Sequence, residues 1–161
     1  MQGKIPVLER PRARRRPNAP GFRLEDHLFF YFSQILSRRT RALNLSLRAH
    51  GLDYPRWRVL AVLHEHSGAT MGRLAALTSV DRTSLTHTLG LMEREKLVFR
   101  RARENDRRNL EIGLTPAGRR VFARILPLTL AETERALAGL TQRQVQSLRE
   151  ALLQIADNLK E

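Results

Sequence analysis

Two helical segments with a tight turn between them, followed at once by two strand-like segments, constrain the fold of this chain more than any other feature. The first helical segment covers residues 71–77 and the second covers residues 82–95. Residues 97–103 alternate loosely in polarity, residues 104–106 have the composition of a turn, and residues 110–114 alternate as a half-buried strand does. This order predicts a pair of short helices and a β-hairpin with a charged tip.

The longer of these two helices has two distinct faces. Asp81 stands at its N-cap position, where a carboxylate accepts backbone N–H groups and suits the positive end of the helix dipole. Thr70 can cap the shorter helix in the same way. The apolar residues Leu85, Leu89 and Met92 share one face. The opposite face carries Arg82, Thr83, Thr86, His87 and Gly90.

Further helices are predicted on both sides of this unit. Apolar residues recur at helical steps over residues 24–49 and again over residues 55–66. After the hairpin, a Thr-Pro pair predicts the start of a long helix over residues 116–138, with a kink at Pro127. Thr141 begins a capping box for the last helix. The predicted fold class is therefore mainly α with a small β-hairpin.

The last helix carries an apolar seam. Its members recur at alternating steps of three and four residues, as in a coiled coil: Val145, Leu148, Leu152, Ile155 and Leu159. The matching helix of a second copy would bury this seam. Packing on residues 24–47 of the same chain is the alternative, and we expect both contacts together.

The chain is strongly basic, with 29 Lys and Arg residues against 16 Asp and Glu residues and a net charge of +13. Such an excess favours a polyanionic partner, either nucleic acid or an anionic membrane surface. Residues 1–22 are rich in arginine and proline and offer little apolar surface to bury, which predicts a flexible basic arm. This arm either reaches DNA phosphates and the minor groove or is a solvated tail. Residues 23–161 are predicted to form a single domain.

The spacing of the two short helices is that of a helix-turn-helix, in which the second helix lies in the major groove of DNA. No acidic residue lies between Arg82 and Met92 to repel phosphate. Arginine can bind guanine through two hydrogen bonds, and hydroxyl and imidazole groups can reach bases or phosphates. The predicted DNA-binding residues of this helix are Arg82, Thr83, Ser84, Thr86 and His87.

The hairpin that follows carries further arginines. Arg107 and Arg108 lie at its tip, where they are best placed to enter a minor groove, whose negative potential attracts arginine. The alternative is a solvated charged turn. A hairpin directly after a helix-turn-helix favours a DNA-contacting wing and hence a winged helix-turn-helix.

The run from Asp106 to Gly118 resembles the wing signature of the MarR family of transcriptional regulators. It has Asp-x-Arg at the wing tip and Leu-Thr-x-x-Gly at the entry to the next helix. Residues 81–101 resemble the recognition helix and first wing strand of the family, and residues 52–63 resemble its second helix. The resemblance covers residues 24–160.

This resemblance implies a triangular homodimer that binds double-stranded DNA at a pseudo-palindromic operator. Residues 24–49 and 116–160 would supply the dimerisation helices, and residues 53–115 would form the winged helix-turn-helix. Asp106 would orient the wing together with Arg108. Many members of the family release DNA when a small aromatic or anionic ligand binds, so the resemblance implies a repressor with a small-molecule effector.

Two positions depart from the family pattern. Lys96 stands where the family often has glycine, so the recognition helix is expected to end by a route other than a left-handed glycine. His87 stands where an arginine is common, so the base preference there cannot be transferred. The absence of cysteine excludes the peroxide sensing that one branch of the family performs through a thiol.

An effector pocket is predicted at the junction of the first, second and fifth helices. An aromatic wall with a cationic anchor suits an aromatic carboxylate or an acyl thioester. The candidates are Tyr31, His50, Arg56 and Trp57. The alternative is that Trp57 belongs to the core and Arg56 is solvated.

Other classes of protein are disfavoured. The sequence has no glycine-rich phosphate loop, no nucleophile motif and no metal-ligand spacing, so neither an enzyme nor a cofactor or metal site is expected. No stretch approaches the length of a membrane span, and the protein is expected to be cytoplasmic. The alternative hypothesis is an architectural protein that binds DNA or RNA by charge alone.

Overall fold

The computed structural model describes residues 23–103 and 106–160, without the side chains of Glu25 and of residues 103–109. Its contacts divide the chain into a first part that ends at Arg39 and a second part that begins at Thr40. The boundary falls inside the first long helix.

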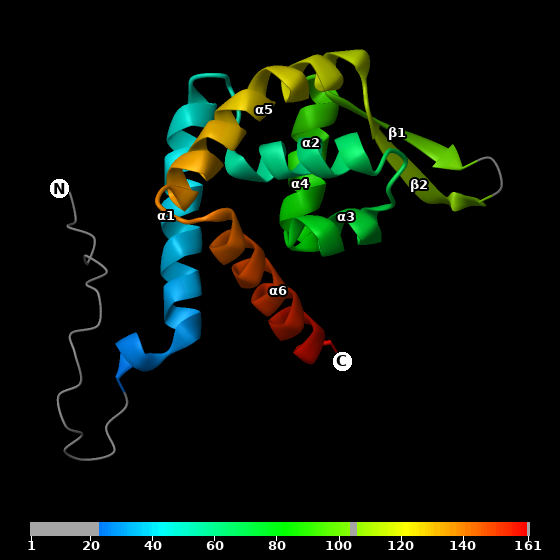
Figure 1. Cartoon of the computed structure of the whole chain (residues 1–161). Coiled ribbons are helices and arrows are strands. Elements are labelled where there is room, and N and C mark those ends of the chain that lie inside the picture. Colours follow the sequence, from blue (N-terminus) through cyan, green and yellow to red (C-terminus); the bar gives the residue numbers. More distant parts are fainter. Residues whose placement is uncertain (1–22, 104–105, 161) are drawn as a thin grey trace, which may run out of the picture. The chain divides into compact units, whose positions relative to one another are not determined.

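The first part holds a short 3-10 helix, η1 (Leu24–Asp26), and the beginning of α1 (Leu28–Arg48) (Figure 1). The prediction of one continuous helix from residue 24 is therefore wrong at its start. His27 has an extended backbone with ψ of 116° and separates the two helices. Arg23, at the N-cap of η1, makes no side-chain cap bond.

The second part contains the three helices of the predicted helix-turn-helix region. They are α2 (Tyr54–Glu65), α3 (Met71–Thr78) and α4 (Arg82–Arg94). The predicted caps of α3 and α4 are confirmed, because the Thr70 hydroxyl accepts a backbone N–H at 3.3 Å and the Asp81 carboxylate accepts one at 2.9 Å. The α3 and α4 boundaries lie within one residue of the predicted ones.

The hairpin consists of β1 (Val98–Arg103) and β2 (Asp106–Leu114), paired antiparallel. Ile112 of β2 also forms a bridge with Ala69, through the hydrogen bonds Gly68 N–H to Ile112 O at 3.1 Å and Ile112 N–H to Ala69 O at 3.0 Å. The loop before α3 thus forms one isolated bridge on the outer side of β2. Within the described residues, β1 is the edge strand of this sheet.

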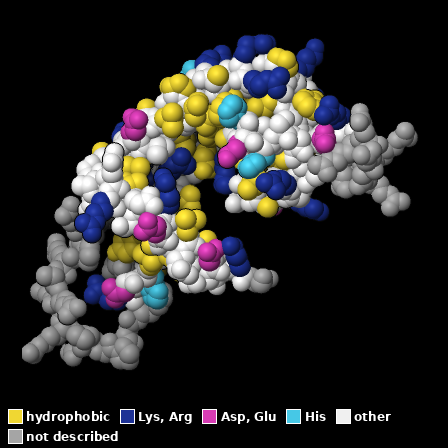
Figure 2. Space-filling view, turned by 45° about the vertical axis from the view of Figure 1, so that its right-hand side comes forward, with side chains coloured by type: hydrophobic (Ala, Val, Ile, Leu, Met, Phe, Trp, Pro, Cys, Tyr) yellow, Lys and Arg dark blue, Asp and Glu magenta, His cyan; other side chains and the backbone are white. Residues whose placement is uncertain are grey.

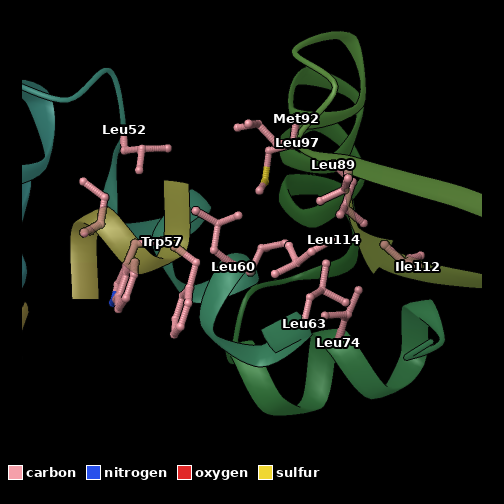
Figure 3. Packing of buried hydrophobic residues seen from close by; sticks show 14 of the residues in the cluster. Leu52, Trp57, Leu60, Leu63, Leu74, Leu89, Met92, Leu97, Ile112 and Leu114 are labelled. Atoms are coloured by element: carbon pink, nitrogen blue, oxygen red, sulfur yellow. The ribbon is translucent and has the colours of Figure 1, made fainter. Parts of the chain in front are cut away.

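The core of the second part is built mainly from leucine (Figure 3). Helices α2, α3 and α4 turn fully buried leucines toward the buried residues of the hairpin. The labelled members of this cluster are Leu52, Trp57, Leu60, Leu63, Leu74, Leu89, Met92, Leu97, Ile112 and Leu114. Truncation of one buried leucine costs about 2–5 kcal/mol, so this core fixes the orientation of α4.

Two long helices complete the chain, α5 (Pro116–Leu137) and α6 (Gln142–Asn158). Helix α5 continues through Pro127, and Gly139, with a φ of +84°, follows its end. The capping box predicted at Thr141 is confirmed: its hydroxyl accepts from the backbone of Gln144, and its own N–H donates to the Gln144 side chain. Helix α6 has no buried residue.

Candidate nucleic-acid interface

The recognition helix predicted from the sequence has the two faces expected of it. The buried side of α4 holds Leu85, Thr88, Leu89 and Met92. The five predicted DNA-binding residues are all exposed: Arg82, Thr83, Ser84, Thr86 and His87. The structure therefore brings these side chains together on one accessible surface, which we call the α4 surface.

Hydrogen bonds within the helix already orient two hydroxyl groups of the α4 surface. The backbone N–H and the hydroxyl of Ser84 both donate to the carboxylate of Asp81, and these bonds hold the pKa of Asp81 below its ordinary value. The hydroxyl of Thr86 donates to the carbonyl of Arg82 at 2.7 Å. In this arrangement both oxygens are left to accept hydrogen bonds from a ligand, as the exocyclic amino groups of bases in the major groove can donate.

Arg82 reaches back toward the start of α3. Its Nη2 lies 3.5 Å from the position that a Cβ would occupy on Gly72. Arg73, in the same turn of α3, is exposed, and neither α3 nor α4 has an acidic residue in its first turn. Two arginines therefore stand at the starts of the two helices of the helix-turn-helix. Figure 2 shows Lys and Arg side chains outnumbering Asp and Glu on the face that it displays.

The end of α4 is a left-handed turn made without glycine. Lys96 has a φ of +57°; its N–H donates to Glu93 O at 2.9 Å, and the N–H of Leu97 donates to Met92 O at 2.8 Å. This pair of bonds is a Schellman motif. The lysine takes the left-handed conformation that glycine would favour, so the helix ends in a Schellman turn without a glycine.

The Thr-x-x-Gly part of the wing signature holds the start of α5 against this turn. The hydroxyl of Thr115 donates to Lys96 O at 2.5 Å and accepts the backbone N–H of Gly118 at 3.0 Å. A Cβ on Gly118 would lie only 2.1 Å from Leu97 O. Only glycine allows the helix to approach the chain so closely, and this contact explains the residue type that the motif requires.

The described part of the wing contains one of the predicted hairpin arginines, Arg101, in a pairing that the sequence did not indicate. Arg101 of β1 donates through Nε to Glu111 of β2 at 3.2 Å, and its guanidinium lies 5.8 Å from the ring centroid of Phe99. The two side chains Arg101 and Glu111 face each other in the strand register. This pair could have been found from the register of the hairpin, but not from composition.

The predicted wing tip lies at the start of β2. Asp106, Arg107 and Arg108 belong to β2 by their backbone. Their side chains lie outside the described residues. Their roles in orienting the wing and entering the minor groove stay predictions.

The four residues predicted to line an effector pocket have different surroundings. Trp57 is buried and stacks on Phe122 of α5, with ring centroids 5.3 Å apart. The guanidinium of Arg56 pairs with the carboxylate of Glu95 and donates to a backbone carbonyl. His50 is exposed, and Tyr31 belongs to the first part of the chain.

The apolar seam predicted on α6 is open in the single chain. Leu148, Leu152 and Leu159 have exposed fractions of 43%, 42% and 69%. Val145 and Ile155 are partly buried. A shallow hollow on α6 is lined by Val145, Leu148, Arg149, Leu152 and Leu153.

Comparisons with known proteins give the family. A model of the MarR family matches residues 50–109. The transcriptional activatory protein BadR of Rhodopseudomonas palustris is 30% identical over 141 residues, which cover 85% of this chain and 81% of BadR. The chain belongs to the MarR family. The transcriptional repressor IacR of Pseudomonas putida is 28% identical over 144 residues, 89% of this chain and 86% of IacR.

A solved structure agrees with this assignment. The crystal structure of a MarR family transcriptional regulator from Silicibacter pomeroyi matches with a TM-score of 0.77 and 28% identity, covering 85% of this chain and 92% of that one. The mainly α fold with a hairpin wing is confirmed, and the chain is a transcriptional regulator of this family. Of the helices whose residues are described, none has the length and apolarity to cross a lipid bilayer.

Proposed function

We propose that this MarR family regulator binds a pseudo-palindromic operator as a homodimer and acts in the cytoplasm by binding rather than by catalysis. Its two α4 helices would enter successive major grooves about 34 Å apart, the length of one helical turn. Arg82, Thr83, Ser84, Thr86 and His87 would contact bases and phosphates. Arg107 and Arg108 would add minor-groove contacts, with the wing oriented by Asp106.

The observation that carries this proposal is the α4 surface. Its polar side chains are exposed together at the start of a helix that the leucine core holds firmly, and no acidic residue interrupts it between Arg82 and Met92. A rigid, cationic and hydroxyl-rich helix face suits direct reading of base edges better than binding by charge alone.

The dimer is supported by the open seam of α6. An exposed row of leucines on a helix without buried residues is the surface that a second copy would cover. In the proposed organisation, residues 1–22 form a basic arm and residues 23–161 form one domain. Residues 24–49 and 116–160 associate between copies, and residues 53–115 form the winged helix-turn-helix.

We further propose that a small aromatic or anionic effector releases the protein from DNA, and that it represses where the operator overlaps a promoter. Family membership supports this step, while the names of IacR and BadR include both a repressor and an activator. Tyr31, His50, Arg56 and Trp57 stay the proposed pocket residues. An anionic effector at Arg56 would have to compete with the carboxylate of Glu95.

The test is selection of bound fragments from the source genome with purified protein at near-physiological salt. A recurring inverted repeat with half-sites one helical turn apart is expected, and the genes beside it would indicate which metabolites to add as effectors. Uniform enrichment that falls steeply with salt and shows no repeat would refute site-specific regulation and favour an architectural role.

A further inference from the structure

Arg56, in the first turn of α2, connects the turn just before its own helix with the distant end of α4. Its Nη1 donates to Gly51 O at 3.0 Å, and its Nη2 pairs with the carboxylate of Glu95. Gly51 has a φ of +71° in the turn that ends α1, and Glu95 is the C-cap residue of α4. The side chain of Arg56, only 14% exposed, thus lies between the end of α1 and the end of the recognition helix.

Both charges of this pair oppose the dipole of their own helix. Arg56 is a cation in the first turn of α2, which has no acidic residue there, and Glu95 is an anion at the carbonyl end of α4. Each placement is unfavourable by itself because helix N-termini favour anions and C-termini favour cations. The two residues offset this disadvantage only when they meet, which requires α2 and α4 to keep one relative position.

The pair contributes little to stability in other respects. The carboxylate side chain of Glu95 is 45% exposed, and exposed ion pairs stabilise proteins weakly. Within the part of the chain that the structure describes, the buried Nε of Arg56 has no hydrogen-bond partner. A guanidinium with a buried, unbonded Nε adds little to the free energy of unfolding. Its planar fork can nevertheless fix two groups in a defined geometry.

The residues next to Glu95 are held from the other side by α5. Thr115, the N-cap of α5, donates through its hydroxyl to Lys96 O and through its N–H to Leu97 O. The end of α4 is therefore held to the turn after α1 through Arg56 and to the start of α5 through Thr115. Helices α1 and α5 are two of the three that the proposed dimer uses, together with α6, and α2 packs directly against α4 (Figure 1).

We infer that Arg56 is a positioning residue, which sets the angle of the recognition helix relative to the dimerisation helices through Gly51 and Glu95. This inference rests on the proposed function. Because Arg56 touches no base in this role, its loss lowers the affinity for the specific site and relaxes the preferred spacing of the half-sites. Binding to unrelated DNA, which depends on surface charge, stays the same.

The experiment is a double-mutant cycle with Arg56→Gln, Glu95→Gln and the double variant in the full chain. Affinities for the selected inverted repeat and for unrelated duplex DNA are measured at one salt concentration, together with thermal unfolding. Each single variant is expected to lower the ratio of specific to non-specific affinity by about tenfold, a typical coupling between sites. The double variant is expected to lose no more than either single one, because both remove the same link.

Arg58→Gln is the matched control, since it removes the same charge from the same helix, and the ring of Tyr54 is the partner seen for it. It should leave the ratio unchanged. Affinities are also measured for inverted repeats with one base pair added to or removed from the spacer between the half-sites. The affinity of Arg56→Gln should vary less with spacer length than that of the wild type. If Arg56→Gln does not fold, Glu95→Gln breaks the same pair and keeps the bond to Gly51.

An unchanged ratio, additive losses in the double variant, or equal losses on specific and unrelated DNA would each overturn the inference while leaving the proposed function intact. A wild-type protein that shows no preferred site would overturn both.

Discussion

Replacement of Gly118 by alanine tests the tightest approach found at a glycine of the described residues. The added Cβ would lie 2.1 Å from Leu97 O and 3.0 Å from Leu97 C. Both are backbone atoms and cannot rotate away, so the first turn of α5 has to shift by about an ångström from the end of α4. That shift stretches the bonds from Thr115 to Leu97 O at 3.0 Å and to Lys96 O at 2.5 Å.

The cost follows from these contacts. Forced overpacking typically costs about 1–3 kcal/mol. Each of the two weakened hydrogen bonds lowers the free energy of unfolding by a further amount of about 1 kcal/mol. The better helix propensity of alanine raises it by about 1 kcal/mol. The net loss is about 2–4 kcal/mol, which corresponds to a fall in Tm of roughly 4–16 °C for a chain of this size.

The assay is thermal unfolding followed by circular dichroism at one protein concentration, with urea unfolding to give the free energy. Gly90→Ala is the matched control: Gly90 also lies in a helix, but a Cβ there meets nothing within 4 Å. This variant should be stabilised by up to about 1 kcal/mol. Equal Tm values for Gly118→Ala and the wild type would refute the close packing of α5 on Leu97.

Four further predictions follow from the same structure. Lys96→Gly should raise the free energy of unfolding by about 1 kcal/mol, because it removes a left-handed non-glycine residue; a lower Tm would contradict the Schellman turn. Arg82→Ala should cost about 1–3 kcal/mol of binding free energy and relax preference at one base step, so an unchanged binding-site profile would remove Arg82 from base reading. Glutamate at both Leu148 and Leu152 should give a folded monomer in light scattering. A folded dimer would show that the apolar seam of α6 packs within one chain and not between copies. The lowered pKa of Asp81 means that its contribution to stability is complete above the ordinary value of 3.8 and is lost as pH falls through the lower folded value, so the free-energy difference between wild type and Asp81→Ala should shrink only below pH 3.8.

Local signals in the sequence were reliable because short-range chemistry decides them. The caps at Thr70, Asp81 and Thr115 and the capping box at Thr141 were predicted from residue type and are all present. The same reasoning failed at Leu24, where the helical spacing continues but an extended residue interrupts the helix. Spacing gives the face of a helix, whereas its first residue depends on the backbone conformation before it.

Contacts between residues that are distant in the sequence could not be predicted from local patterns. Arg56 and Glu95 are 39 positions apart, and no local pattern pairs them. Arg56 was therefore predicted as a possible ligand anchor, because an arginine beside a tryptophan suits an anion. The bridge between Ala69 and Ile112 was missed for a similar reason, since a single pair of bonds leaves no periodicity to detect.

Strand β1 lies at an open edge of the wing, so substitutions of its arginines affect self-association as well as DNA binding. An open strand edge is a template for pairing with another molecule, and charged side chains along it keep such edges apart. In β1 the exposed charge is that of Arg101, which would oppose pairing with the same strand of a neighbouring copy. Alanine or glutamine substitutions intended to weaken DNA binding would leave a neutral edge and favour self-association. Lysine keeps the charge and removes only the planar guanidinium fork, so it is the better replacement for separating loss of DNA affinity from loss of solubility.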